Sequence, residues 1–275
     1  MVRVVGSDTA SNNVRDEETP LLGVSPINPL NKKTWTHRLQ HELSCSWADA
    51  VLLICYVVTG LLDSSSIQVW GTFVSMQTGN TVYVGLGLAS FMTSTPGPRL
   101  YKSALSIASF CLGSFLFARF HRLFSPRRRW VLCASFTLQA LLTSAAALIV
   151  TFRPPSQNPD SLAWNVLLPI VLMAFQSCGQ AVASRALKQN ALISLVLTSV
   201  YCDLFSDKDL FALDNVSRNQ RAAAPLLLLF GVFVGGLFAQ SSVGITGALW
   251  IAAGLKLCMV MAWFVWPSEE EMDED

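Results

Sequence analysis

Eight apolar segments alternate with short polar stretches along most of this 275-residue chain. They cover roughly residues 47–68, 71–92, 101–120, 130–152, 162–183, 190–206, 223–241 and 243–266. Most reach the roughly 17–25 residues that a spanning helix needs. Several end in the aromatic residues typical of membrane interfaces, namely Trp47, Trp130, Trp164, Trp263 and Trp266. The pattern predicts an all-helical (all-α) integral membrane protein.

The second and sixth segments are more polar than the others. One contains Gln77 and Asn80, and the other is short and contains Thr198 and Asp203. Polar groups without partners are costly in lipid, and non-helical backbone at membrane depth occurs only where protein or a cavity surrounds it. Both segments are therefore predicted to be re-entrant or broken and to face the interior of a bundle.

The distribution of Lys and Arg separates two topologies. If all eight segments crossed, the two sides would hold nine and seven of these residues, whereas return of the two polar segments makes the counts thirteen and three. The positive-inside rule favours the second arrangement. It gives six full transmembrane helices plus two polar re-entrant or broken segments, with both termini in the cytosol.

The two halves of the chain also echo each other at an offset of about 120 residues. Thr78 aligns with Thr198, the stretch 109–113 with 231–235, and Trp130 with Trp250. Three crossings and one re-entrant segment per half would make the halves an inverted repeat, which is common in transporters. Eight full spans would instead give two parallel repeats.

The candidate site is a set of polar residues within or beside these segments. An acid inside the membrane is by default a functional-site hypothesis, and Asp63 could exchange a proton there. Side-chain amides, hydroxyls and a glycine that lets the backbone approach a ligand suit the binding of a small solute or a proton. The predicted substrate-binding residues are Asp63, Gln77, Thr78, Gly79, Asn80, Thr81, Gln176 and Thr198.

Each assignment has a structural alternative. Asp63 can instead cap backbone groups near a helix end, and the amides and hydroxyls can hold helices together by interhelical hydrogen bonds. Lys256, in the last apolar segment, either pairs with an acid such as Asp63 or Asp203 or lies shielded at a helix contact. Arg185 is expected to extend toward the membrane interface.

Composition excludes several classes of function. Hydrophobic residues make up 52% of the chain and charged residues 13%, and the formal net charge of +1 predicts no nucleic-acid partner. The seven cysteines contain no CxxC pair, and the sequence lacks metal-ligand spacing, a phosphate loop and a catalytic triad order. We expect neither an enzyme nor a cofactor or metal site.

The ends of the chain are polar. Residues 1–43 predict a disordered cytosolic tail, and residues 267–275 form an acidic one, so that 44–266 is the membrane domain. In the N-terminal tail, Glu17 with Leu21 and Leu22 resembles the acidic dileucine signal that adaptor complexes read. It predicts an endosomal or vacuolar location, with the plasma membrane as the alternative.

Two stretches carry a resemblance to a known family. Gly60-Leu61-Leu62-Asp63 and Thr78-Gly79-Asn80-Thr81-Val82 resemble the YoaK-like family, labelled domain of unknown function 1275, over about residues 47–266. Its members are small multi-spanning membrane proteins, which implies an architecture rather than an activity. The family's second-half Gly-x-Gln-Asn-Ala and Thr-Gly patterns keep only Gln176 and Thr198 here, which favours a site dominated by the first half. The long N-terminal tail is typical of a fungal member.

These observations favour a small-solute transporter with its site around Asp63 and residues 77–81. The alternative is a non-transporting scaffold or sorting partner, in which the polar residues only lock helices together.

The topology makes a prediction at the sequon Asn215-Val216-Ser217. The loop before the seventh apolar segment should face the cytosol, so Asn215 should carry no glycan when the protein is expressed in a eukaryotic cell. Endoglycosidase treatment should leave its gel mobility unchanged, and a shift that disappears in Asn215→Gln would contradict the six-crossing topology.

Overall fold

The computed structural model describes residues 48–92, 95–125, 128–155, 158, 160–187, 196–212 and 214–266, and every regular element in them is a helix. The helices are α2 (Ala48–Trp70), α3 (Gln77–Ser90), α4 (Pro98–Leu123), α5 (Arg129–Phe152), α6 (Trp164–Ala186), α7 (Leu197–Phe205), α8 (Val216–Gln240) and α9 (Gly244–Val265). Six of them, all except α3 and α7, are long and apolar enough to cross a membrane. The predicted all-helical class is confirmed. The two tails and the dileucine stretch lie outside the described residues.

The main difference from the expected boundaries is in the second segment. The segment 71–92, which was predicted to be re-entrant or broken, forms α3 only from Gln77, after six residues of irregular backbone. Helix α2 ends at Trp70 because Gly71 adopts a positive φ of 74°, and its N–H donates to the Ile67 carbonyl in the manner of a left-handed helix cap. Helices α4 and α8 begin before their apolar windows, since polar residues at a helix end do not interrupt it.

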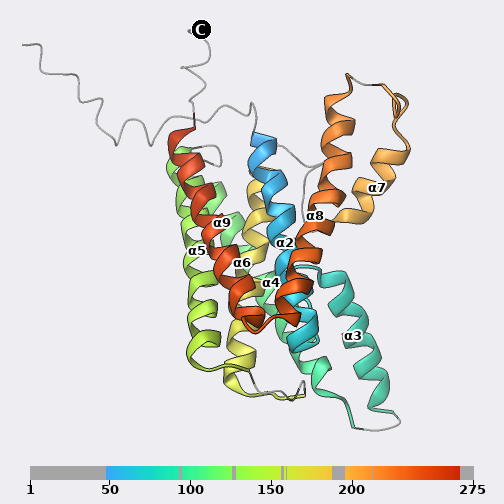
Figure 1. Ribbon diagram of the computed structural model, residues 1–275, viewed down its shortest axis with the longest axis vertical. Helices are drawn as coiled ribbons and strands as arrows, with labels where there is room; N and C mark the ends of the chain where they lie inside the picture. The colour runs from blue at the N-terminus through green and yellow to red at the C-terminus, as the bar shows by residue number, and fades with distance from the viewer. Residues whose placement is uncertain are drawn as a thin grey trace, which may run out of the picture.

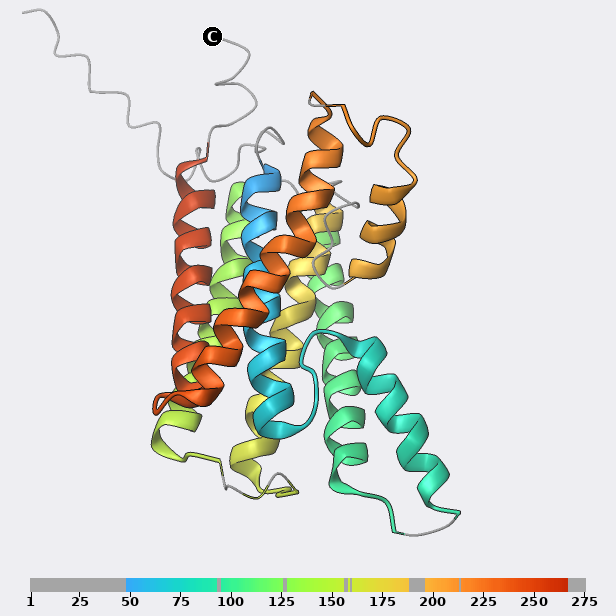
Figure 2. The same ribbon diagram turned by 45° about the vertical axis from the view of Figure 1, so that its right-hand side comes forward.

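The two short helices start inside the bundle rather than at its ends. Helix α2 runs from the upper end of Figure 1 to the lower end, and the chain then returns to about mid-height, where α3 starts and runs down again. Helix α6 runs upward, and α7 starts near mid-height and also runs upward (Figures 1 and 2). The described chain begins and ends at the same, upper end of the bundle. These directions agree with six crossings and two half-length segments.

The halves α2–α5 and α6–α9 form an inverted repeat. Corresponding helices run in opposite directions (Figure 2). The contacts follow the same relation, because α2 packs chiefly on α8 as α6 packs chiefly on α4, and α5 packs on its own counterpart α9. Thr78 and Thr198 are each the second residue of their short helices, so their alignment is correct. Trp130 and Trp250 stand at different positions in α5 and α9 and are not equivalent.

Glycines allow close contacts between helices of the two halves. A methyl group added at Gly231 of α8 would lie 2.2 Å from the Val57 carbonyl oxygen of α2, and one at Gly113 of α4 would lie 2.6 Å from the Phe175 oxygen of α6. The same spacing along the chain separates Gly113 from Gly231 and Val57 from Phe175. The expected alignment of 109–113 with 231–235 is therefore wrong by one helical turn, because glycines four residues apart match equally well in either register.

This contact predicts a stability effect with a matched control. Gly231→Ala should lower the free energy of unfolding by about 1–3 kcal/mol, because the new methyl group meets backbone that cannot move aside without separating α2 from α8. Gly254→Ala should have no such effect, because no atom lies within 4 Å of its added methyl group. Melting curves of the purified variants in detergent would measure this, and equal destabilisation by both would contradict the assigned contact.

Candidate functional site

The irregular segment 71–76 is held inside the bundle by Asp63. One carboxylate oxygen accepts hydrogen bonds from the backbone N–H groups of Val74, at 2.8 Å, and Ser75, at 2.9 Å. The other accepts from the Met76 N–H at 3.1 Å and from the Ser75 hydroxyl. Asp63 is 2% exposed, so its carboxylate replaces the water that these donors would otherwise bind. The carboxylate acts as a cap for the segment that leads into α3.

Asn80 holds the same segment from the other side. Its Oδ1 accepts from the Thr72 hydroxyl at 2.8 Å and from the Phe73 N–H at 3.0 Å, while its Nδ2 donates to the Phe73 carbonyl at 2.8 Å. Its Nδ2 also lies 2.8 Å from Gln77 Oε1 and 3.1 Å from Ser106 Oγ of α4. A single buried amide thus joins the irregular segment, α3 and α4.

Side chains from further helices also hydrogen-bond this segment, and together with Asp63 and Asn80 they form what we call the cage around residues 71–76. Ser106 of α4 donates to the Phe73 carbonyl at 2.8 Å, and Ser177 of α6 donates to the Val74 carbonyl at 2.9 Å. Lys102 donates to the Trp70 carbonyl at 3.3 Å. The non-helical backbone is therefore hydrogen-bonded by side chains from four helices, which is the condition for placing it at membrane depth.

The other first-half candidates have smaller structural roles. A methyl group at Gly79 would lie 2.6 Å from the Phe73 ring, so glycine lets α3 start close to the irregular segment. The Thr81 hydroxyl donates to the Gln77 carbonyl at 2.9 Å, one turn back along α3, and faces outward. Asp63, Gly79 and Asn80 thus contact the irregular segment, whereas Thr81 faces outward, and none of the four is among the described residues that line the cavity described next.

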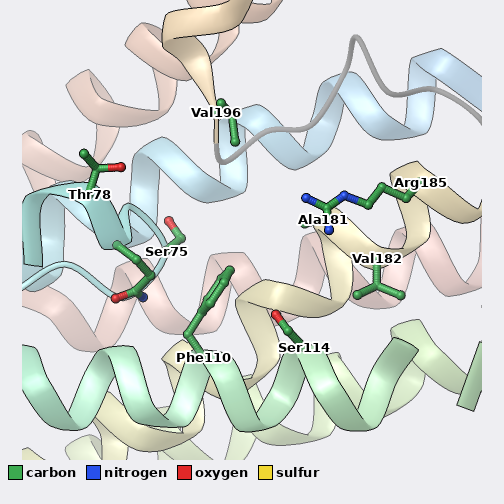
Figure 3. A pocket seen from close by; sticks show the side chains of 9 residues that line it. Ser75, Thr78, Phe110, Ser114, Ala181, Val182, Arg185 and Val196 are labelled. Carbon is green, nitrogen blue, oxygen red and sulfur yellow. The ribbon is translucent and has the colours of Figure 1, made fainter. Parts of the chain in front are cut away.

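A cavity of about 180 Å³ lies beside this cage, between the starts of α3 and α7 and the facing parts of α4 and α6. Its polar lining comprises Ser75, Gln77, Thr78, Ser114 and Arg185. Its apolar lining comprises Phe110, Ala181, Val182 and Val196. Figure 3 shows these side chains converging from the separate elements. Gln77 and Thr78 are the two predicted site residues that border it.

Sequence reasoning missed three of the polar lining residues. Ser75 and Ser114 are two of many serines in the chain, and the sequence does not distinguish them from the others. Their role in the lining depends on the packing of α3 against α4. Arg185 was expected to extend to the interface, yet it borders the cavity near the end of α6. The signal available was its place in the chain shortly before α7, since the corresponding part of the first half, between Asp63 and α3, is also polar.

The second-half candidates do not join the first-half group. Gln176 of α6 is fully buried, and neither atom of its side-chain amide has a protein hydrogen-bond partner among the described residues. Gln180, one turn further, accepts from the Thr59 hydroxyl of α2 at 3.3 Å. Thr198 is exposed on α7. The inverted repeat therefore carries two different sets of polar residues rather than a symmetric pair of sites.

Lys256 of α9 is fully buried at a helix contact and pairs with neither Asp63 nor Asp203. Its ammonium group donates to Gln139 Oε1 of α5 at 2.8 Å. A methyl group at Gly179 of α6 would lie 2.6 Å from Gln139 Nε2, so the amide is wedged between α5, α6 and α9. Of the two arrangements open from the sequence, the shielded one is observed.

A second hollow is larger but almost entirely apolar. It has a volume of about 310 Å³ and is lined by Leu116, Phe117, Phe120, Ala134, Ser135, Leu138 and Phe175 on α4, α5 and α6. Such a lining suits a lipid chain rather than a polar solute.

The cap formed by Asp63 predicts a large loss of stability on its removal. Asp63→Ala leaves the N–H groups of residues 74–76 buried without an acceptor, at about 1–3 kcal/mol each, so the free energy of unfolding should fall by about 3 kcal/mol or more. Asp203→Ala, at an exposed acid of α7, should melt like the unchanged protein.

Asp63→Asn keeps one acceptor oxygen, so its melting temperature should lie between those of Asp63→Ala and Asp203→Ala. Melting in detergent, together with hydrogen exchange in the peptide that contains residues 71–76, would measure both effects. Wild-type melting and protection in Asp63→Ala would exclude the capping role.

Comparison with known proteins identifies a family. No curated protein and no solved structure matches the chain. Residues 51–262, which span all six long helices, match the family described as "Protein of unknown function (DUF1275)". Since the match covers more than half of the sequence, this multi-pass membrane protein belongs to the DUF1275 family.

Proposed function

We propose that the protein is a membrane transporter for a small polar solute, which binds in the cavity between the starts of α3 and α7. The observation that carries the proposal is the position of this cavity. Two half-length helices from the two inverted halves begin beside it, at about the mid-height of the bundle (Figure 2). In transporters built from inverted repeats, discontinuous helices near the midplane form the substrate site.

Two polar residues of the cavity, Thr78 and Arg185, differ from the residues that hold the segment 71–76. Asp63 and Asn80 have their polar atoms occupied by the protein itself. Thr78 and Arg185 border the cavity and make no side-chain hydrogen bond or ion pair within the described structure. Polar groups that serve only to lock helices together would be expected to use their hydrogen bonds as Asp63 does. This contrast favours transport over a scaffold role.

The size of the cavity limits the solute. A volume of about 180 Å³ is below the roughly 300–1,000 Å³ of pockets for drug-sized ligands. It suits a molecule of few non-hydrogen atoms. Thr78 and Arg185 are exposed, so the cavity reaches the surface of the bundle.

The proposed orientation places the upper end of Figure 1 in the cytosol. The end of α4 and the starts of α5 and α8 bring Arg119, Arg122, Arg129, Arg218 and Arg221 to that end, while the opposite end has Arg99, Lys102 and Arg153. Both ends of the described chain lie on the same side, which supports cytosolic termini. An endosomal or vacuolar membrane follows from the dileucine stretch alone.

Blocking the cavity is the direct test. Ser114→Phe places a ring in the cavity, whereas Cys111→Phe places the same ring on the exposed side of α4, outside the lining. Proteoliposomes containing each protein would be assayed for uptake of labelled short carboxylates, amino acids, sugars and inorganic anions, against protein-free vesicles.

We expect at least one solute to enter with the unchanged protein and with Cys111→Phe, and its initial rate to fall at least tenfold with Ser114→Phe. Both variants should remain monodisperse in detergent. Uptake of no solute, or equal uptake by the two variants, would contradict the proposal and leave the scaffold role.

A further inference from the structure

Among the described residues that line the cavity between α3, α4 and α6, one is charged, and its charge is positive. Arg185 is the charged residue of its lining, and no Asp or Glu of the described chain belongs to that lining. The nearest acid along the hydrogen-bond network is Asp63, which bonds to Ser75. Asp63 is buried behind Ser75, and its two oxygens are occupied by donors from residues 74–76. The electrostatic character of the cavity surface is therefore set by Arg185.

Arg185 is available to a ligand. It lies in the last turn of α6, its side chain is exposed, and it forms no ion pair or hydrogen bond within the described structure. In Figure 3 the Arg185 side chain extends along α6, and its guanidinium group lies beside Ala181. A guanidinium group has several donors in one plane, which match the two oxygens of a carboxylate.

The opposite side of the cavity adds further donors. Helix α3 begins there, and its first turn borders the cavity with Gln77 and Thr78. The N–H and the side-chain amide of Gln77 donate within the protein, so the donor that this turn offers to a ligand is on Thr78. The N-terminus of a helix favours negative charge. The Thr78 hydroxyl makes no hydrogen bond within the described structure, and Ser114 of α4, whose hydroxyl bonds to Cys178, also lines the cavity. Donors from two sides thus surround one small space.

Apart from Ser75, the rest of the described lining is apolar. Phe110, Ala181, Val182 and Val196 cover the part of the surface between these donors. Inorganic phosphate or sulfate would leave these side chains in contact with a fully hydrated ion. A short organic acid places a charged head at Arg185 and an apolar body against Phe110 and Val182, which uses both kinds of surface.

We propose that the cavity binds a small monocarboxylate, with its carboxylate at Arg185 and the first turn of α3. This inference rests on the proposed function only in taking the cavity as the solute site, and it names the class of solute. Arg185 is the specificity-determining residue, and Thr78 contributes a hydrogen bond to the same carboxylate.

Binding can be measured without transport. The full-length protein in detergent would be titrated by calorimetry with sodium propionate, with inorganic phosphate, and with propionamide, which has the shape of propionate but no charge. We expect saturable binding of propionate, and binding of propionamide and phosphate at least tenfold weaker. Equal binding of propionamide, or tighter binding of phosphate, would overturn the monocarboxylate assignment.

Variants locate the site. Arg185→Gln should weaken propionate binding at least tenfold, Arg185→Lys should weaken it less, and Thr78→Val should weaken it severalfold. The matched control is Arg119→Gln, at an exposed arginine of α4 that stacks on Phe115 away from the cavity. Melting curves establish that each variant is folded. If Arg185→Gln, folded as judged by its melting curve, binds propionate like Arg119→Gln, the site is not at Arg185.

Uptake of labelled propionate into proteoliposomes separates this inference from the proposed function. Binding that depends on Arg185, without uptake of any solute, supports the carboxylate site and rejects transport. Uptake of a sugar or amino acid that survives in Arg185→Gln, without propionate binding, supports transport and rejects the carboxylate assignment.

Discussion

The structure depends on one constraint, that six residues of non-helical backbone lie inside a bundle of membrane helices. Each unpaired N–H or C=O group in such a place costs several kcal/mol, because no lipid atom can replace water as a partner. Asp63 meets this constraint on one side with acceptors for residues 74–76, and Asn80 meets it on the other with bonds to residues 72 and 73. Because the segment is held at mid-height, α3 starts there, and the cavity exists beside its first turn.

A second constraint sets how the two halves join. Gly231 and Gly113 let each half place a long helix directly on the backbone of the other half, at equivalent positions. Such close contacts are stabilised by packing, since lipid provides no hydrophobic driving force between helices. The inverted arrangement brings the starts of α3 and α7 toward each other from opposite halves (Figure 1).

Asp63 and Lys256, two of the charges buried inside the bundle, have separate roles. Asp63 is satisfied by backbone donors, and Lys256 is satisfied in part by Gln139, at a contact of α5, α6 and α9. The two side chains therefore do not form an ion pair, which was one of the arrangements that the sequence left open. The cavity instead takes its charge from Arg185, near the end of a helix, where a cation also interacts favourably with the helix dipole.

The sequence by itself determined the helical class, the six crossings and the two polar half-segments. These depend on the length and polarity of continuous stretches and on the sidedness of Lys and Arg, which are local or additive properties. It also identified Asp63, Gln77, Thr78, Gly79 and Asn80 as a spatial group, because polar residues within a membrane segment have few places to lie. The sequence did not show which role each of these residues has.

Only the tertiary structure decided that Asp63 and Asn80 hold backbone while Gln77 and Thr78 face a cavity. It also brought Ser114 and Arg185, from α4 and α6, to the same space, and it separated Gln176 and Thr198 from it. The physical reason is that a hydrogen bond or a cavity wall depends on which helices meet and at what depth. Those contacts are set by packing between segments far apart in the chain, through glycines whose register repeats every turn and cannot be chosen from the sequence alone.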